Sequence, residues 1–410
     1  MGAPEEVQAL VAHEGRAPGT DAERRAAREV ERRLRELGRE AEAEHVEAWP
    51  AWHLTYALHA LLAIVGSVVS VSSAIVGALI VLVALLLTML DATGIALTTR
   101  RLFGRRASQN VVSRQDDDKP GTLVLVAHYD AGRTGFLFSR RVEERRATLG
   151  RLVRRPIGPL QPLLWAMLAV LACTIVRVPG IENTVLTAIQ FVPTAALILA
   201  LPLLIDIALS PVSPGANDNA SGVAAALALA ERHGGRLEHF DLWVVLTGAQ
   251  EALAVGMRSF LRRHRSQLGR ERTVFLNLDE VGHGTVRYTR REGLALTVRS
   301  HPQLVGLCDG IAEDDEDAFG ARPLTNRTAS DGYAARSGGY PAITVTCRNA
   351  LDYTPEHHQL SDTPERIDPD AIERAVGFCS ELLGRLDAEV GEDLAKHAED
   401  TVLSEAEESG

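Results

Sequence analysis

Residues 123–130 have the sequence LVLVAHYD, an uninterrupted apolar run that ends in a histidine and, two residues later, an aspartate. A short apolar run of this kind predicts a strand that is buried on both faces, as strands of parallel sheets are. A histidine at the end of such a strand can ligate a metal ion, and a carboxylate two residues on can orient its ring. We therefore predict that this strand delivers His128 to a site and that Asp130 orients His128.

Four further segments carry side chains of the same kind at strand ends or in nearby turns. The candidates are Asp218 in a turn that leads into a helix, Glu251 and Asp279 after two more apolar runs, and His358 in a loop after the last predicted strand. Asp218 by itself would be interpreted as a helix cap. Together the segments offer two histidines and three carboxylates, a donor set suited to a pair of zinc ions that share one carboxylate.

Strands and helices alternate along the polar parts of the chain. We predict helices at residues 22–37, 221–232, 252–264 and 369–386, and strands at residues 43–48, 110–113, 122–127, 240–246, 273–278, 294–298 and 342–346. This alternation predicts an α/β fold with a mixed, mainly parallel sheet flanked by helices on both faces. Ligands of such sheets bind beyond the carboxyl ends of the strands, where the candidate residues fall.

Two long apolar stretches do not fit a soluble α/β domain. Residues 54–90 contain no Asp, Glu, Lys or Arg, and they exceed the roughly 20 residues of one membrane crossing. A turn within residues 66–73 would divide them. Residues 159–205 form a second pair, broken by a polar segment that contains Arg177 and Glu182. Helices buried in the core of a large soluble protein are the alternative, but charge-free runs of this length are rare there. We predict four transmembrane helices, arranged as two inserted hairpins.

The two hairpins define the domain organisation. Residues 1–53, 91–158 and 206–388 would form one soluble domain, residues 54–90 and 159–205 the hairpins, and residues 389–410 an acidic tail. Basic residues flank the hairpins on the soluble side, at Arg100, Arg101, Arg105, Arg106, Arg151, Arg154 and Arg155. By the positive-inside rule, we predict an integral membrane protein, of the plasma membrane, whose soluble domain faces the cytoplasm.

The amino-acid composition limits the classes of partner that the protein could bind. The chain has 410 residues, 46% of them hydrophobic and 24% charged, with a formal net charge of −11. This composition argues against an intrinsically disordered chain and, by bulk charge, against nucleic acid as a partner. A lipid bilayer is the partner that the apolar blocks predict. A transporter or channel role is disfavoured, because the apolar segments hold acidic or basic residues only near their ends. His59, within the first block, is interpreted as packed between helices.

An ordered series of motifs runs through the soluble parts of the chain: HYD at 128–130, GANDNASGVA at 215–224, TGxxE at 247–251, NLDxxG at 277–282, SDxxxxxxxGYPAI at 330–343 and HxxxDTPERID at 358–368. This series resembles the co-catalytic zinc aminopeptidases of metallopeptidase family 28. The resemblance implies the zinc aminopeptidase fold and two zinc ions. His128 and Asp279 would bind one ion, Glu251 and His358 the other, and Asp218 would bridge them. It also implies a peptide or small amide as substrate, hydrolysed by a water that the metals activate.

The histidine of the last motif has a neighbour that competes for its role. His357 precedes His358, but the four-residue step from His358 to Asp362 matches the family pattern. We therefore assign the ligand role to His358 and interpret His357 as a solvent-facing loop residue.

Gln250 departs from the family pattern at the catalytic position. Family members normally carry a second glutamate there, which accepts a proton from the attacking water and passes it to the leaving amine. A carboxamide can hold water but has no useful basicity, so general-base assistance of about a hundredfold to ten-thousandfold would be missing. Glu280 and Asp331 are nearby candidates for a substitute base. Gly332, where relatives often have histidine, is a second departure.

Two functions follow from these patterns. The leading hypothesis is a membrane-anchored metallopeptidase, an aminopeptidase-like hydrolase. The alternative is a catalytically silent, metal-binding homologue that binds a peptide or protein partner.

Overall fold

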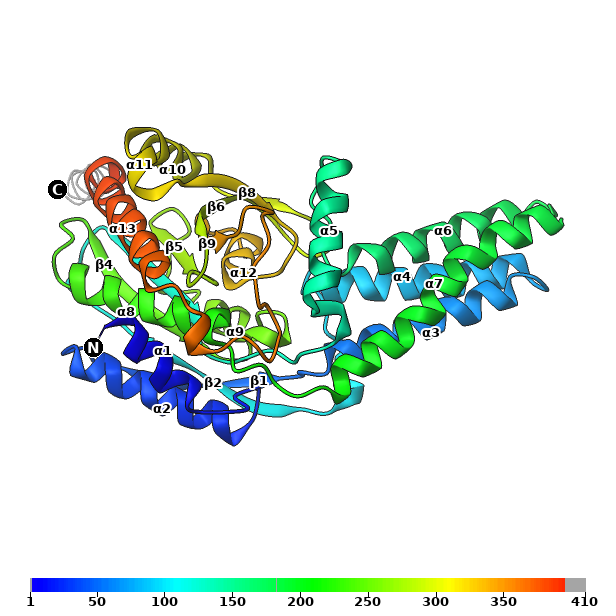
Figure 1. Cartoon of the computed structure of the whole chain (residues 1–410), viewed down its shortest axis with the longest axis horizontal. Helices are drawn as coiled ribbons and strands as arrows, with labels where there is room; N and C mark the ends of the chain where they lie inside the picture. The colour runs from blue at the N-terminus through cyan, green and yellow to red at the C-terminus, as the bar shows by residue number, and fades with distance from the viewer. Residues whose placement is uncertain (1, 182, 395–410) are drawn as a thin grey trace, which may run out of the picture.

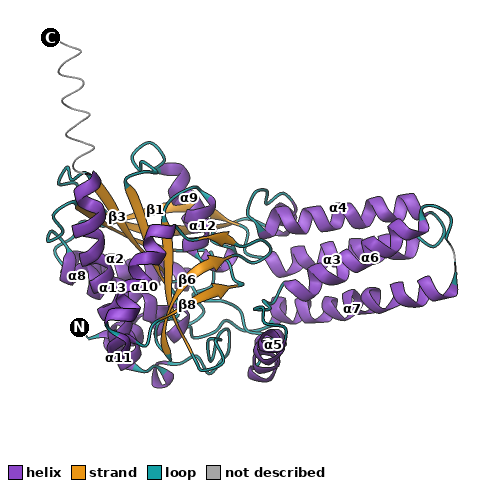
Figure 2. Cartoon of the chain, turned by 90° about the horizontal axis from the view of Figure 1, so that it is seen from above, coloured by secondary structure: helices purple, strands orange, loops and turns teal. Residues whose placement is uncertain are grey.

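The computed structural model describes residues 2–181 and 183–394. It consists of an α/β domain and a bundle of long helices that projects from one end of that domain (Figure 1). The two parts are distinct in both views (Figure 2). Of the predicted acidic tail, residues 395–410 lie outside the described residues.

A nine-stranded mixed sheet forms the centre of the α/β domain. Its strands are β1 (Glu42–Ala48), β2 (Arg106–Ser113), β3 (Gly121–His128), β4 (Phe240–Thr247), β5 (Thr273–Leu278), β6 (Thr285–Glu292), β7 (Val298–Arg299), β8 (Arg322–Asn326) and β9 (Ala342–Arg348). The order is β1-β2-β4-β3-β5-β9-β6-β7, with β8 paired to β6. The central strands β4, β3, β5 and β9 are parallel, whereas β1, β2 and β6 pair antiparallel with their neighbours in this order. The carboxyl ends of the central strands therefore meet at one edge.

Helices cover both faces of the sheet, as predicted. Along β3, Leu123 and Leu125 pack into one apolar core, and Val124 and Val126 pack into another on the opposite face. The first core is closed by α1 (Ala3–Val11), α2 (Asp21–Glu36), α8 (Gly222–His233), α10 (Pro302–Asp314) and α13 (Pro369–Arg385). The second core is closed by α9 (Val255–Arg263) and α12 (Asp331–Ser337). Alternate residues of one strand thus serve two cores, which explains its continuous apolar sequence.

The bundle consists of α3 (Trp52–Val69), α4 (Ala74–Ala92), α6 (Gln161–Arg177) and α7 (Thr184–Leu209). Three of these helices are long and apolar enough to cross a membrane, and α6 is apolar but has only 17 residues. Small side chains such as Ala60, Ala63 and Ala84 are buried between the helices, while large apolar side chains such as Leu79 and Phe191 are exposed on the outside. His59 is buried and contacts Thr88 and Thr99 through its two ring nitrogens.

Two basic residues beside the hairpins are buried. Arg100 is fully buried, because both carboxylate oxygens of Asp91 accept hydrogen bonds from its guanidinium, at 2.6 and 2.8 Å. Arg177 ends α6 instead of lying in the loop, and its Nε donates to Gln190 Oε1 at 2.8 Å. Arg100 therefore links helix α4 to the segment that follows it.

The predicted strand at residues 294–298 is wrong. The chain there is a bend that leads into the two-residue strand β7, while the longer strand β6 precedes it. Strand β6 has the sequence TVRYTRRE, in which charged side chains interrupt the apolar pattern. Its Glu292 is buried and pairs with Arg336 of α12. A distant ion pair therefore compensates the buried charge in this strand. Because the strand has no continuous apolar run, the sequence pattern does not predict it.

Candidate metal centre

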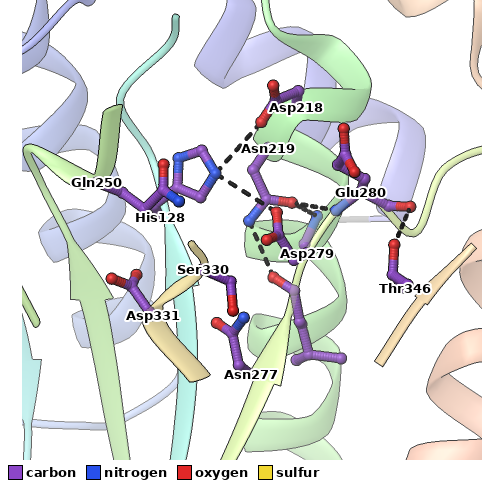
Figure 3. A network of polar contacts seen from close by, with 12 residues as sticks. His128, Asp218, Asn219, Gln250, Asn277, Asp279, Glu280, Ser330, Asp331 and Thr346 are labelled. Carbon is purple, nitrogen blue, oxygen red and sulfur yellow. Dashed lines mark hydrogen bonds and ion pairs between the residues drawn. The ribbon is translucent and has the colours of Figure 1, made fainter. Parts of the chain in front are cut away.

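The structure brings all five predicted ligands together. His128 is the last residue of β3, Asp218 lies in the irregular turn η3 (Ala216–Ser221), and Glu251 lies in the turn η4 (Gln250–Ala252) after β4. Asp279 directly follows β5, and His358 comes from the loop before η5 (Pro364–Arg366). Figure 3 shows His128 pointing toward both Asp218 and Asp279. The parallel centre of the sheet places three of these segments at one edge.

Asp218 lies between two histidines. Its Oδ1 is 3.3 Å from His128 Nε2, and its Oδ2 is 3.3 Å from His358 Nε2. On the first side, His128 Nε2 is 3.5 Å from Asp279 Oδ1. On the other side, His358 Nε2 is 3.1 Å from Glu251 Oε1. The five side chains thus form two halves that share Asp218, the same grouping that the family resemblance implies.

The donor set fits zinc. Ligand atoms of His128, Asp218 and Glu251 lie within 4.8 Å of one another. Asp218 Oδ2 is buried and makes no hydrogen bond of good geometry with a described residue, although His357 Nδ1 and His358 Nε2 lie 3.0 and 3.3 Å away. A buried carboxylate oxygen without a hydrogen bond is costly unless a cation compensates it. Imidazole nitrogens and carboxylate oxygens are ligands that zinc accepts.

Asp130 links two of the ligand segments. Its carboxylate accepts hydrogen bonds from the backbone N–H groups of Gln250, at 3.2 Å, and Glu251, at 3.0 Å. The same carboxylate lies 3.4 Å from His128 Nδ1, and that nitrogen is 3.2 Å from the carbonyl oxygen of Asp130. Asp130 is therefore placed to fix the His128 ring and the turn that carries Glu251 at the same time.

Two supporting residues have no assigned role in the sequence prediction. The carboxylate of Asp362 accepts the backbone N–H groups of Asn217, at 2.7 Å, and Asp218, at 3.1 Å. Burial raises the pKa of Asp362 to about 7. Arg16 is fully buried and donates to the carbonyl oxygens of Tyr129, at 2.8 Å, and Gly215, at 2.6 Å. The last motif contains Asp362, whereas nothing in the sequence around Arg16 marks it.

His357 is not a solvent-facing residue, and the interpretation of it as one is wrong. Its side chain is 23% exposed, and its Nδ1 lies 3.0 Å from Asp218 Oδ2 and 2.6 Å from Glu280 Oε1. The His357 and His358 rings stack with their centroids 4.1 Å apart. Both histidines reach Asp218, but only His358 forms an ion pair with Glu251, and His357 is held by Glu280 instead.

Opposite charges within the cluster shift the pKa values of its members. Burial by itself lowers the pKa of His128, but hydrogen bonds to Asp130, Asp218 and Asp279 outweigh burial and raise this pKa well above its usual value. Burial would raise the pKa of Asp218, but its histidine neighbours hold this pKa well below the usual range. Burial raises the pKa of Asp279 to about 6. The imidazoles therefore stand where positive charge is favoured, as expected for a cation site.

Neither candidate substitute base suits the role. Burial would raise the pKa of Glu280, but the charges of Arg348 and His357 lower it to about 2, so this carboxylate is a weak base. Burial raises the pKa of Asp331 to about 7, but Asp331 accepts a hydrogen bond from Thr247 and does not line the cavity beside the cluster. Gln250 does line that cavity, and its Nε2 donates to the carbonyl oxygen of Ala329 at 3.2 Å.

The fold is a mixed α/β fold like that of zinc aminopeptidases, and the cluster lies at the carboxyl ends of its central strands. The predicted resemblance to metallopeptidase family 28 is confirmed, because residues 205–383 match the sequence model of peptidase family M28. That match contains four of the five candidate ligands, and His128 lies outside it. No curated protein matches the chain by sequence.

Several solved structures share the fold of this chain. An aminopeptidase of Legionella pneumophila, LapA, is 11% identical with a TM-score of 0.53, over 95% of this chain and 72% of that one. A glutaminyl cyclase of Tannerella forsythia is 14% identical with a TM-score of 0.55, over 93% and 97%. A leucine aminopeptidase precursor of Bacteroides thetaiotaomicron is 13% identical with a TM-score of 0.53, over 93% and 95%. These likenesses show the fold.

Proposed function

We propose that the protein is a membrane-anchored, zinc-dependent amide hydrolase of the aminopeptidase type. The observation that carries the proposal is the position of Asp218 between His128 and His358, with one carboxylate oxygen facing each ring. His128 and Asp279 would hold one ion, Glu251 and His358 the other, and Asp218 would contact both. The apolar helices of the bundle would anchor the site at a membrane, with the α/β domain on the cytoplasmic side.

The residues of the chain have separate tasks in this reaction. When bound, two zinc ions would supply Lewis acidity for activating water and polarising the amide carbonyl. Asp130 holds the His128 ring and the turn that carries Glu251 in fixed relative positions, so that these ligands need not reorganise when zinc binds. Gln250 can accept a hydrogen bond from water through Oε1, but it cannot take up a proton. Proton transfer by this residue is therefore excluded in the wild-type chain.

The proposal is tested by metal content and hydrolysis together. The purified full-length protein, loaded with zinc, should retain two zinc ions per chain and release product from an aminoacyl reporter amide. Asp218→Ala should lose both properties, because it removes the carboxylate that the two halves share. Asp309→Ala is the matched control, since Asp309 pairs with Arg290 and does not line the cavity. A wild-type chain that binds no zinc would refute the proposal.

Gln250 favours a second candidate, a silent homologue that binds metal and a partner peptide without cleaving it. This candidate predicts two zinc ions but no product release. The two candidates differ in the wild-type chain, which releases product only if it is a hydrolase; a silent homologue should begin to hydrolyse only when Gln250→Glu restores the carboxylate.

A further inference from the structure

The candidate metal centre lines one cavity, and a second cavity of opposite character adjoins the first. The first, which we call the apolar cavity, has a volume of about 390 Å³ and is walled by the bundle at Leu160, Leu163, Ala166, Leu197, Ala200 and Leu204. The second, which we call the basic cavity, has about 420 Å³ and is lined by Arg146, Arg151, Arg154, Arg155, Arg327 and Arg348. Both cavities are lined by Pro159, Glu280, Thr328 and His357, so they meet beside the ligands.

The apolar cavity reaches the outer surface of the bundle. Ala196 and Leu199 of α7 line it, and both are exposed, Leu199 by 65%. The cavity is therefore open toward the side on which lipid would lie if the bundle crosses a membrane. Away from the cluster, its polar lining is limited to Trp52, Tyr56, Gln250 and Thr328. A peptide backbone would leave amide groups unpaired there, at a cost that a hydrocarbon chain avoids.

The basic cavity has more positive charge than its acids balance. Its three carboxylates are each already paired with an arginine: Glu143 with Arg146, Glu280 with Arg348, and Asp352 with Arg287. Among the described residues, Arg327 forms no ion pair, and its buried Nε has no hydrogen-bond partner. An anionic group, above all a carboxylate, would satisfy this guanidinium.

We propose that the substrates are long-chain N-acyl amino acids, an inference that rests on the amide-hydrolase function proposed above. The acyl chain lies in the apolar cavity, the amide lies at the metal centre, and the carboxylate of the amino acid lies in the basic cavity. Each cavity falls in the range of about 300–1,000 Å³ that is usual for small-molecule sites. Water adds to the amide carbonyl carbon, the C–N bond breaks, and the leaving nitrogen takes the proton. The products are a fatty carboxylate and a free amino acid.

The chemistry of the two cavities predicts how substrates should rank. Hydrolysis by the zinc-loaded full-length protein is compared for N-dodecanoylglycine, N-octanoylglycine, N-acetylglycine and the uncharged N-dodecanoylglycinamide. We expect kcat/KM to rise about fourfold for each methylene that enters the apolar cavity. Loss of the carboxylate in the glycinamide should lower kcat/KM at least about tenfold.

Matched variants test each cavity. Ala200→Trp fills the apolar cavity and should abolish the gain with chain length, while Ala188→Trp, at an exposed position of the same helix outside the cavity, should not. Arg327→Gln should remove the preference for the carboxylate over the amide. Arg322→Gln, in strand β8 just before Arg327 but outside the basic cavity, should keep it. Neither Arg variant touches a candidate ligand.

Equilibrium binding of radiolabelled N-dodecanoylglycine separates this inference from the hydrolytic function. Binding that needs both the long chain and the carboxylate, and that Ala200→Trp and Arg327→Gln each weaken, supports the inference even if no substrate is cleaved. If the aminoacyl reporter is cleaved but N-dodecanoylglycine is neither bound nor cleaved, the inference is overturned and the hydrolase function stands. A preference for uncharged apolar peptides over N-dodecanoylglycine would also overturn it.

Discussion

Gln250→Glu is the substitution that most directly tests why the site has a carboxamide at the position of the general base. Gln250 is fixed by its backbone, which donates to Asp130, and by its side chain, which donates to the carbonyl oxygen of Ala329 at 3.2 Å. A glutamate keeps the backbone bond but cannot donate to Ala329. Its ionised carboxylate is repelled by that carbonyl and should turn toward the cavity that Gln250 already lines.

The expected magnitudes follow from these contacts. Loss of the hydrogen bond to Ala329 should cost about 1 kcal/mol of stability, a small part of the about 5–15 kcal/mol that holds a typical domain folded. A correctly placed general base raises the rate by about a hundredfold to ten-thousandfold, which lowers the barrier by about 2.7–5.4 kcal/mol. The gain in rate should therefore be visible in a protein that still folds and binds zinc.

The assay is kcat for the aminoacyl reporter and for N-dodecanoylglycine, with zinc content measured on the same samples. Gln250→Met is the control, because it loses the same hydrogen bond to Ala329 without supplying a base, and it should show no gain. A Gln250→Glu protein with full zinc content and less than a tenfold gain would refute the reasoning. That result would mean that another group already accepts the proton, or that the residue at this position does not face the reacting water.

Three further predictions concern metal, pH and the junction with the bundle. Chelation of zinc should lower the Tm of the wild type, since a ligand present at about 1,000 times its Kd stabilises by about 4 kcal/mol; the Tm of Asp218→Ala should not respond to the chelator. Burial lowers the pKa of His264, but its contact with Glu44 at 2.7 Å outweighs burial and raises this pKa above its usual value. The folded protein therefore binds this proton more tightly, so the pair should stabilise fully below about pH 6.5 and lose this effect as the pH rises through the raised pKa. The Tm difference between wild type and His264→Gln should shrink accordingly between pH 5.5 and pH 9, and a constant difference would contradict the assignment. Asp91→Ala should destabilise by about 3–5 kcal/mol in chemical unfolding, because it leaves the buried guanidinium of Arg100 unpaired, and adding Arg100→Leu should recover part of the loss.

Local pattern predicted most of the elements that position the site. Strand β3 was predicted at residues 122–127 and is found at Gly121–His128, because its apolar residues are buried on both faces whatever their exact partners. Helix α13 was predicted at residues 369–386 and is found at Pro369–Arg385, because its apolar face repeats at helical spacing. Strand β6 could not be predicted, since its charged residues depend on partners such as Arg336 that lie far away in the sequence.

The sequence predicted that the candidate ligands lie close together, because each of them lies at the end of an apolar strand or in a turn with a recognisable motif. The supporting contacts were not predicted. Arg16 donates a hydrogen bond to the carbonyl oxygen of Tyr129, which directly follows β3 and lies 113 residues away in the sequence, and His357 forms a hydrogen bond with Glu280. Such contacts have no local periodicity, so nothing in the chain marks them.

The sequence by itself determined the apolar blocks, the buried strands and the acid and histidine side chains at their ends, because burial and periodicity are properties of short segments. Only the tertiary structure decided that Asp218 lies between two imidazoles and that the bundle walls one side of the site while arginines line the other. These relations join segments from both hairpins and from the α/β domain. Their physical basis is the packing of distant segments against one another, which no single segment encodes.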